Sequence, residues 1–173
     1  MQHSRTAYLG FGGNVGDVAP RIFAAWETLG RVPTIEIAAR SKLYRTEPEG
    51  GPENQAEYLN AALRVETALQ ARELLNLCLN IERDMGRVRR ERWGPRTLDI
   101  DLWLFGDEVV DEPGLIVPHP RLRERLFALV PLADAAPADL VLPPDGRPLA
   151  TVLNEALAQA GQTLDDWRRR VLG

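Results

Sequence analysis

The alternation of apolar and polar residues along the chain predicts a sheet with two long helices between its strands. Strands alternate with period two or form short apolar runs, whereas the helices carry an apolar stripe on one side. The predicted strands span residues 6–12, 34–45, 58–67 and 97–105, and the predicted helices span residues 17–29 and 71–85. Asp17 is the expected N-cap of the first helix.

The remaining third of the chain predicts further helices. Gly106-Asp107 indicates a hairpin turn that leads into residues 108–111, and helical patterns cover residues 120–135 and 148–160. The order β-α-β-β-α-β followed by extra helices is typical of the ferredoxin-like plait, an α+β fold (α/β plait) with an antiparallel sheet. The length of 173 residues predicts a single domain. This fold supports many activities, so it predicts none by itself.

Two carboxylates lie on one face of the fourth predicted strand. Asp99 and Asp101 flank Ile100, and period two places both on the same side. The opposite, apolar face consists of Leu98, Ile100, Leu102 and Leu104. Like charges this close repel, and Mg²⁺, which often takes one or two carboxylates plus substrate phosphates, would remove the repulsion. A solvated sheet face, or an acid paired with a nearby arginine, is the alternative interpretation.

The net charge of −4 is unevenly distributed. Six arginines and two acids lie between Arg83 and Arg96, which gives this segment a local charge of +4. An acidic protein with one basic segment is a poor general binder of nucleic acid, and a compact polyanion such as a nucleoside triphosphate fits better. The motif RWGPRTLDID leads from guanidinium groups into the carboxylate pair, which is the layout that phosphoryl transfer needs. A solvated surface loop is the alternative.

Other common sites are excluded by the sequence. The chain's one lysine, Lys42, follows no glycine loop, so there is no Walker A motif, and the first glycine turn is one residue too long for a dinucleotide fingerprint. Cys78 is the single cysteine, so no internal disulfide and no zinc site is expected. No signal peptide and no membrane-spanning apolar run is visible, so we expect a cytoplasmic protein without membrane or nucleic-acid partners.

A histidine and several aromatic or amide side chains are candidates for binding. His119 could donate to a phosphate or be structural. Trp93, within the arginine segment, could stack on a flat heterocycle, and Phe127 could do the same or belong to the core. Tyr58 and Asn60 point together from the third strand, where an amide can donate and accept along a heterocycle edge, or where both residues form ordinary sheet surface.

Together these motifs resemble the family of 6-hydroxymethyl-7,8-dihydropterin pyrophosphokinases. The resemblance runs from Ala7 to about Leu157 and is strongest in GRVRRERWGPRTLDIDLWLFG, with support from VPHPRLRERLFALVPL, YRTEP, YLNAA and LGFGGNVGD. It implies transfer of diphosphate from ATP to the hydroxymethyl group of the pterin, with release of AMP, in tetrahydrofolate biosynthesis. The implied partners are these two small molecules, and a monomer is expected.

The resemblance also implies roles for individual residues. Asp99 and Asp101 would hold two Mg²⁺ ions and act in catalysis with Arg87 and Arg96. ATP would be bound by Arg87, Arg89, Arg92, Arg96, His119 and Arg125. The pterin would contact Thr46, Tyr58, Asn60, Trp93 and Phe127. Loops at residues 13–17, 46–57 and 86–95 would surround the site.

The chain departs from the family's pattern in three places. The stretch between Arg89 and Arg92 is one residue shorter than in some members, Trp103 stands where smaller aliphatic residues are commoner, and the tail at residues 162–173 lies outside the resemblance.

Three rival functions remain open. A nucleotidyltransferase would use the same aspartates to attack the α-phosphorus of ATP and would release pyrophosphate. A ferredoxin-like RNA-binding module would need exposed sheet aromatics in an RNP-like pattern, which the sequence lacks. A plain interaction domain would leave the clustering of Arg, Trp and Asp unexplained.

Overall fold

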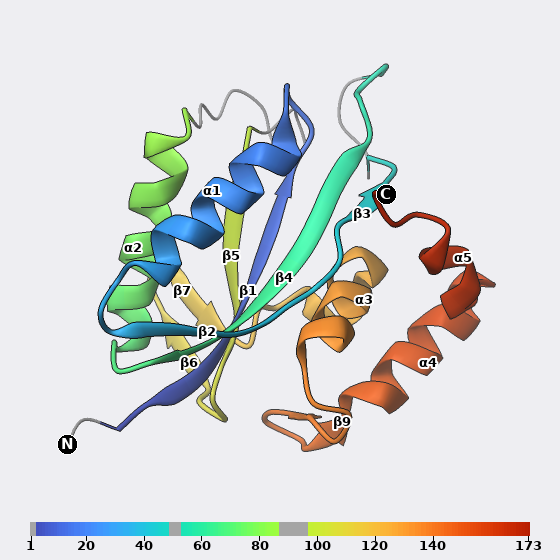
Figure 1. The fold of residues 1–173 in the computed structure, drawn as a ribbon. Coiled ribbons are helices and arrows are strands. Elements are labelled where there is room, and N and C mark those ends of the chain that lie inside the picture. The colour runs from blue at the N-terminus through green and yellow to red at the C-terminus, as the bar shows by residue number, and fades with distance from the viewer. Residues whose placement is uncertain (1–2, 49–52, 87–96) are drawn as a thin grey trace.

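The computed structural model describes residues 3–48, 53–86 and 97–173 (Figure 1). The strands are β1 (Arg5–Gly13), β2 (Ile35–Arg40), β3 (Tyr44–Thr46), β4 (Tyr58–Thr67), β5 (Asp99–Phe105), β6 (Val110–Glu112), β7 (Leu115–Val117), β8 (Val141–Leu142) and β9 (Arg147–Pro148). The helices are α1 (Val18–Gly30), α2 (Ala71–Asp84), α3 (Leu126–Ala135), α4 (Leu149–Ala160) and α5 (Leu164–Arg168), with a 3₁₀ turn at Leu122–Glu124. No helix within these ranges is long and apolar enough to cross a membrane.

The main sheet has the strand order β2-β4-β1-β5, and β3 extends it by pairing with β4. Every neighbouring pair is antiparallel. Helices α1 and α2 cover one face, and α3 covers the other, with α4 packed against α3 (Figure 1). This arrangement confirms the predicted ferredoxin-like β-α-β-β-α-β core with an antiparallel sheet and extra C-terminal helices.

Each face of the sheet has its own apolar cluster. The cluster under α1 and α2 includes Leu9, Ile22, Leu63, Leu74 and Cys78. The cluster under α3 and α4 includes Tyr8, Ala62, Leu129, Leu153 and Trp167. Because both faces are buried, the central strands β1 and β4 carry apolar residues on both sides, unlike a strand with one wet face.

The predicted strand at residues 34–45 is wrong as one continuous strand, because it is interrupted at Ser41. The backbone N–H of Ser41 donates to the Ala62 carbonyl at 2.9 Å, while the Ser41 hydroxyl accepts the Ala62 N–H at 2.7 Å. The hydroxyl replaces the backbone acceptor that a straight strand would supply, so the chain bends before β3. The predicted inward direction of Ser41 and Leu43 is confirmed, since both are buried.

Strand β5 contains a bulge that the sequence pattern did not reveal. Leu102 pairs with Leu9 and Leu104 pairs with Tyr8, so Trp103 is an extra residue on β5. A bulge reverses the alternation of side chains beyond it. Leu104 therefore belongs to the cluster under α3, and the prediction that it shares a face with Leu102 is wrong.

Two further predictions need correction. The turn at Gly106 forms, with φ of 54°, but residues 108–111 do not pair with β5, and β6 pairs with β7 instead. The Gly106 N–H donates to the Thr6 carbonyl at 2.7 Å, which keeps the chain beside β1. The helix predicted at 120–135 begins only at Leu126, because Arg125 has an extended backbone with φ of −119° and ψ of 107°.

The tail beyond the family resemblance is attached to the edge strand β3. The Arg45 N–H donates to the Arg170 carbonyl at 2.8 Å, and the Leu172 N–H donates to the Leu43 carbonyl at 2.9 Å. The rings of Tyr44 and Trp167 meet edge to face, with centroids 6.0 Å apart. The tail thus satisfies the backbone groups that an edge strand otherwise exposes.

Replacing Trp167 tests how much this attachment stabilises the fold. The ring is buried in the cluster under α3 and α4, so Trp167→Ala is expected to lower the free energy of unfolding by about 3 kcal/mol. Urea unfolding followed by circular dichroism measures the loss. Trp167→Phe keeps most of the ring and should lose clearly less; equal losses for the two variants would contradict the packing role.

Candidate active site

Asp99 and Asp101 face a cavity of about 180 Å³ on the side of the sheet covered by α3. Asp101 is exposed and Asp99 is half-buried, and both line the cavity as the period-two argument predicted. Their partners on β1 are glycines, because Gly12 pairs with Asp99 and Gly10 pairs with Asp101. The space above these carboxylates is therefore not filled by side chains of the neighbouring strand.

Glu82 supports this strand from the opposite side of the sheet, a role that the sequence prediction missed. Its carboxylate accepts the Ile100 N–H at 2.6 Å, and the residue is only 3% exposed. Ile100 lies between the two aspartates, so this bond fixes the backbone that presents them. The available signal was a glutamate four residues after Cys78, on the apolar stripe of α2, where a charged side chain needs a partner.

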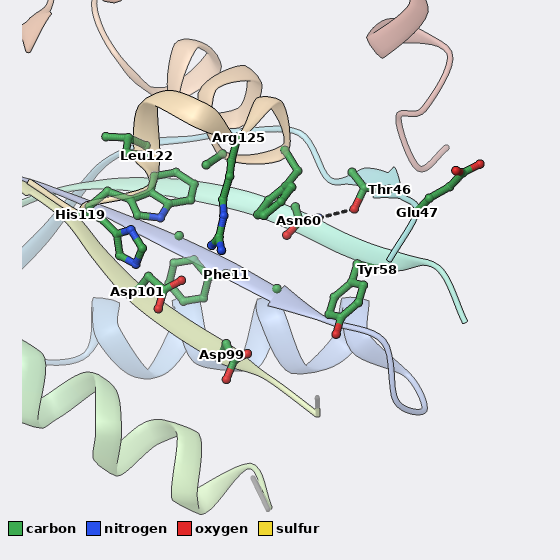
Figure 2. Close-up of a pocket in the computed structure, with 15 residues that line it drawn as sticks. Phe11, Thr46, Glu47, Tyr58, Asn60, Asp99, Asp101, His119, Leu122 and Arg125 are labelled. Carbon is green, nitrogen blue, oxygen red and sulfur yellow. Dashed lines mark hydrogen bonds between the residues drawn. The ribbon is translucent and has the colours of Figure 1, made fainter. Parts of the chain in front are cut away.

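The predicted heterocycle-binding residues of the described ranges come together at one end of the cavity. The Asn60 amide donates to the Thr46 hydroxyl at 2.6 Å, which links β4 to the end of β3. Tyr58 lies toward the same end (Figure 2), and Phe127 also lines the cavity. A Cβ on Gly12 would lie 2.8 Å from the Asn60 amide oxygen, so only glycine leaves the amide its place.

His119 and Arg125 supply nitrogen donors to the same cavity. Figure 2 shows Arg125 extending from the start of α3 toward β1, with Asp101 and His119 on one side of it and Asn60 on the other. The extended backbone that delays α3 also aims this side chain, whose guanidinium lies 5.3 Å from the centre of the Phe127 ring. The carboxylates and His119 thus share one end, and the amide and hydroxyl groups share the other.

The protonation of His119 is set mainly by burial, which lowers its pKa below the usual value. Asp101 acts in the opposite direction, and the cationic Arg125 and Arg121 lower the pKa further. Its Nδ1 accepts the Arg121 N–H at 3.2 Å, so the single proton of the neutral ring lies on Nε2. At neutral pH His119 is therefore a neutral donor through Nε2.

The donor set of the cavity determines which metal fits. Within the described ranges no group of three or more His, Cys, Asp or Glu is placed to hold a metal ion. Two carboxylates with open space above them suit Mg²⁺, which keeps several waters and shares substrate phosphates, and do not suit a structural zinc site.

Five predicted residues lie outside the described ranges. These are Arg87, Arg89, Arg92, Trp93 and Arg96. Their expected roles remain predictions. Of the predicted loops, the first contacts the second, because the Asn14 amide donates to the Ala56 carbonyl at 3.1 Å and to Gln55 at 3.3 Å.

Comparison with known proteins gives consistent matches. A family model described as 7,8-dihydro-6-hydroxymethylpterin-pyrophosphokinase (HPPK) matches residues 8–137. A 2-amino-4-hydroxy-6-hydroxymethyldihydropteridine pyrophosphokinase of Methylorubrum extorquens is 48% identical over 136 residues, which cover 79% of this chain and 85% of the relative. The enzyme of the same name from Bacillus subtilis is 44% identical over 128 residues, 74% of this chain and 76% of the relative.

Solved structures show the same fold. A crystal structure of Plasmodium falciparum HPPK-DHPS with pteroate superposes with a TM-score of 0.73 at 14% identity. The superposition covers 95% of this chain and 44% of that longer chain, so this chain spans less than half of it. At this identity the likeness supports the fold alone.

Removing the Glu82 carboxylate tests its support of the aspartate strand. Glu82→Ala leaves the Ile100 N–H buried without its acceptor, so the free energy of unfolding should fall by about 1–3 kcal/mol. Glu82→Gln keeps an acceptor oxygen of the same reach and should lose less. Chemical unfolding of both variants makes the comparison, and a glutamine variant as unstable as the alanine variant would rule out the hydrogen bond as the cause.

Proposed function

The chain belongs to the family of 7,8-dihydro-6-hydroxymethylpterin pyrophosphokinases, and on this premise we propose how its residues perform the family's reaction. The protein transfers diphosphate from ATP to the hydroxymethyl group of 6-hydroxymethyl-7,8-dihydropterin and releases AMP, a step of tetrahydrofolate biosynthesis. ATP is the co-substrate, and Mg²⁺ dependence is part of the proposal.

The alignment of three neighbouring strands relates the carboxylates to the proposed pterin pocket. Asp99 on β5, Gly12 on β1 and Asn60 on β4 occupy adjacent positions across three strands. Neighbouring strands lie about 4.8 Å apart, so the carboxylate and the amide are separated by roughly 10 Å of open sheet surface. A flat heterocycle held at Asn60 can therefore extend a short arm toward phosphates held near Asp99.

The pterin occupies the end of the cavity that contains Asn60. The Asn60 amide and the Thr46 hydroxyl offer donors and acceptors to the edge of the ring, as a pyrimidinone edge requires. Phe127 offers a face for stacking, with Trp93 as the proposed partner on the other side of the ring, and Tyr58 closes the end of the pocket.

The triphosphate occupies the end that contains the carboxylates. Asp99 and Asp101 would hold two Mg²⁺ ions, which offset the negative charge of the phosphates when bound. Arg125 and the Nε2–H of His119 bind phosphate oxygens from the side of α3. Arg87, Arg89, Arg92 and Arg96 complete the proposed ATP contacts, and Arg87 and Arg96 neutralise charge that develops during transfer.

The reaction forms one bond and breaks one bond. The hydroxymethyl oxygen of the pterin attacks the β-phosphorus of ATP, and the bond from that phosphorus to the oxygen bridging it to the α-phosphorus breaks. The bridging oxygen leaves with AMP, and the hydroxyl proton is released. The chain's contribution is to hold the two reactants in line, which can supply much of the acceleration of a two-substrate reaction.

The setting of the reaction is also part of the proposal. We propose that the protein acts in the cytoplasm as a monomer with these two substrates as partners and without nucleic acid or membrane. The attachment of the tail to β3 supports a single domain over residues 1–173, because the last residues pack on the same sheet as the first.

Substituting each aspartate tests the metal assignment. Asp99→Asn and Asp101→Asn keep the size of the side chain but remove its charge, so kcat should fall roughly 10²–10³-fold at saturating Mg²⁺. Asp107→Asn, at the exposed turn after β5, removes an equal charge away from the cavity and should keep normal turnover. AMP formation, followed by chromatography, is the measurement, and normal Mg²⁺-dependent turnover in the first two variants would refute the assignment.

The products of the unmodified protein test the proposed attack. Incubation with ATP, Mg²⁺ and the hydroxymethyl-dihydropterin should yield AMP and the pterin diphosphate. Released pyrophosphate would instead favour the nucleotidyltransferase, and ADP with a pterin monophosphate would contradict attack on the β-phosphorus.

A further inference from the structure

Trp103, expected from the sequence to depart from the family's pattern, lines the cavity. It follows Asp101 by two residues on β5 and forms the bulge described above. Its carbonyl accepts the backbone N–H of His119 at 2.9 Å, so the residue adjoins the histidine at the phosphate end.

The indole N–H of Trp103 has no partner in the described part of the chain. The side chain is 6% exposed, and a tryptophan so deeply buried usually directs its N–H to an acceptor. The cavity is the open space that the residue borders. A donor without a partner at the edge of a polar cavity indicates a ligand acceptor.

Gly10 creates the space for this ring. A Cβ on Gly10 would overlap the Cζ2 and Cε2 atoms of Trp103 and would lie 2.7 Å from its Nε1. The nitrogen edge of the indole therefore lies over Gly10, which pairs with Asp101. The large ring of Trp103 on β5 therefore requires glycine at position 10 of β1.

On the basis of the proposed function, we propose that the Trp103 indole N–H donates a hydrogen bond to a phosphate oxygen of the bound nucleotide. A neutral donor at this position can bind an anionic oxygen without competing with Mg²⁺ for the Asp101 carboxylate. The indole thus adds to His119 a second donor that binds anionic oxygen without carrying charge. Trp103 is then a substrate-contacting residue that belongs to this chain rather than to the family pattern.

Trp103→Phe is the direct test, since it removes the N–H and keeps an aromatic ring. The dissociation constant of α,β-methylene-ATP with Mg²⁺, measured by calorimetry without pterin, should rise about tenfold, as expected for loss of a hydrogen bond to a charged group. The dissociation constant of the pterin should stay unchanged. Trp26→Phe is the matched control, because Trp26 is 5% exposed and its Nε1 also has no partner among the described residues, but it belongs to α1 and packs on the opposite face of the sheet.

Gly10→Ala tests the pairing from the other strand. The added methyl should displace the indole and weaken nucleotide binding to a similar extent. If both variants remove the same bond, the double variant Gly10→Ala with Trp103→Phe should bind the nucleotide no more weakly than either single variant. Additive losses would mean that Gly10 acts independently of Trp103.

Nuclear magnetic resonance of the unmodified protein gives a readout that does not depend on the variants folding. With ¹⁵N-labelled tryptophan, the indole signal that Trp103→Phe lacks should move downfield when α,β-methylene-ATP and Mg²⁺ are added. A stationary Trp103 signal, or a loss confined to pterin binding, would overturn the proposal. Failure to release AMP in the full reaction would refute the proposed function. The Trp103 proposal is tested separately, by the indole signal and the nucleotide dissociation constant.

Discussion

The site depends on a stretch of central strand that carries no side chains on one face. Gly10 and Gly12 lie between the carboxylates of β5 and the residues of β4, and their positions are opposite Ala62 and Asn60. Glycine weakens a strand interior, because it gives up more backbone freedom on folding and packs nothing. Here β1 pairs on both sides along this stretch, so the sheet tolerates the loss, and the space over the glycines admits the Trp103 ring at Gly10 and the Asn60 amide at Gly12, both of which line the cavity.

Carboxylates and a guanidinium line the same cavity, so groups of both charge signs lie close together there. Asp101 raises and Arg125 lowers the pKa of His119, which shows that all three share one electrostatic environment. Burial decides the balance, so the imidazole stays neutral and donates through Nε2. The cavity thus presents carboxylates, which suit cations, beside nitrogen donors, which suit anions, and a metal-bound polyphosphate requires this combination.

The sequence predicted the fold more completely than it predicted the geometry of the site. Period-two and helical patterns located β4 and α2 within one residue, because those elements bury long, regular stripes. The break at Ser41 and the bulge at Trp103 were missed, since each depends on a partner strand rather than on local pattern. Glu82 was missed for the same reason: its acceptor role exists only once α2 lies across β5. The paired carboxylates were found because two residues on one strand need no tertiary information to share a face.

The tail at residues 162–173 lies outside the family resemblance, yet it contributes to the packing of the fold. Its backbone hydrogen bonds join Arg170 to Arg45 in β3 and Leu172 to Leu43 just before β3, and such groups are present on almost every residue whatever its side chain. Because these contacts use backbone atoms, they fix the path of the chain but require few particular side chains. The buried ring of Trp167 is the exception. The path nevertheless matters to the cavity, because β3 ends at Thr46, whose hydroxyl accepts from Asn60. Thr46 and Asn60, the proposed pterin contacts, are thus held in part by a segment that lies outside the family resemblance.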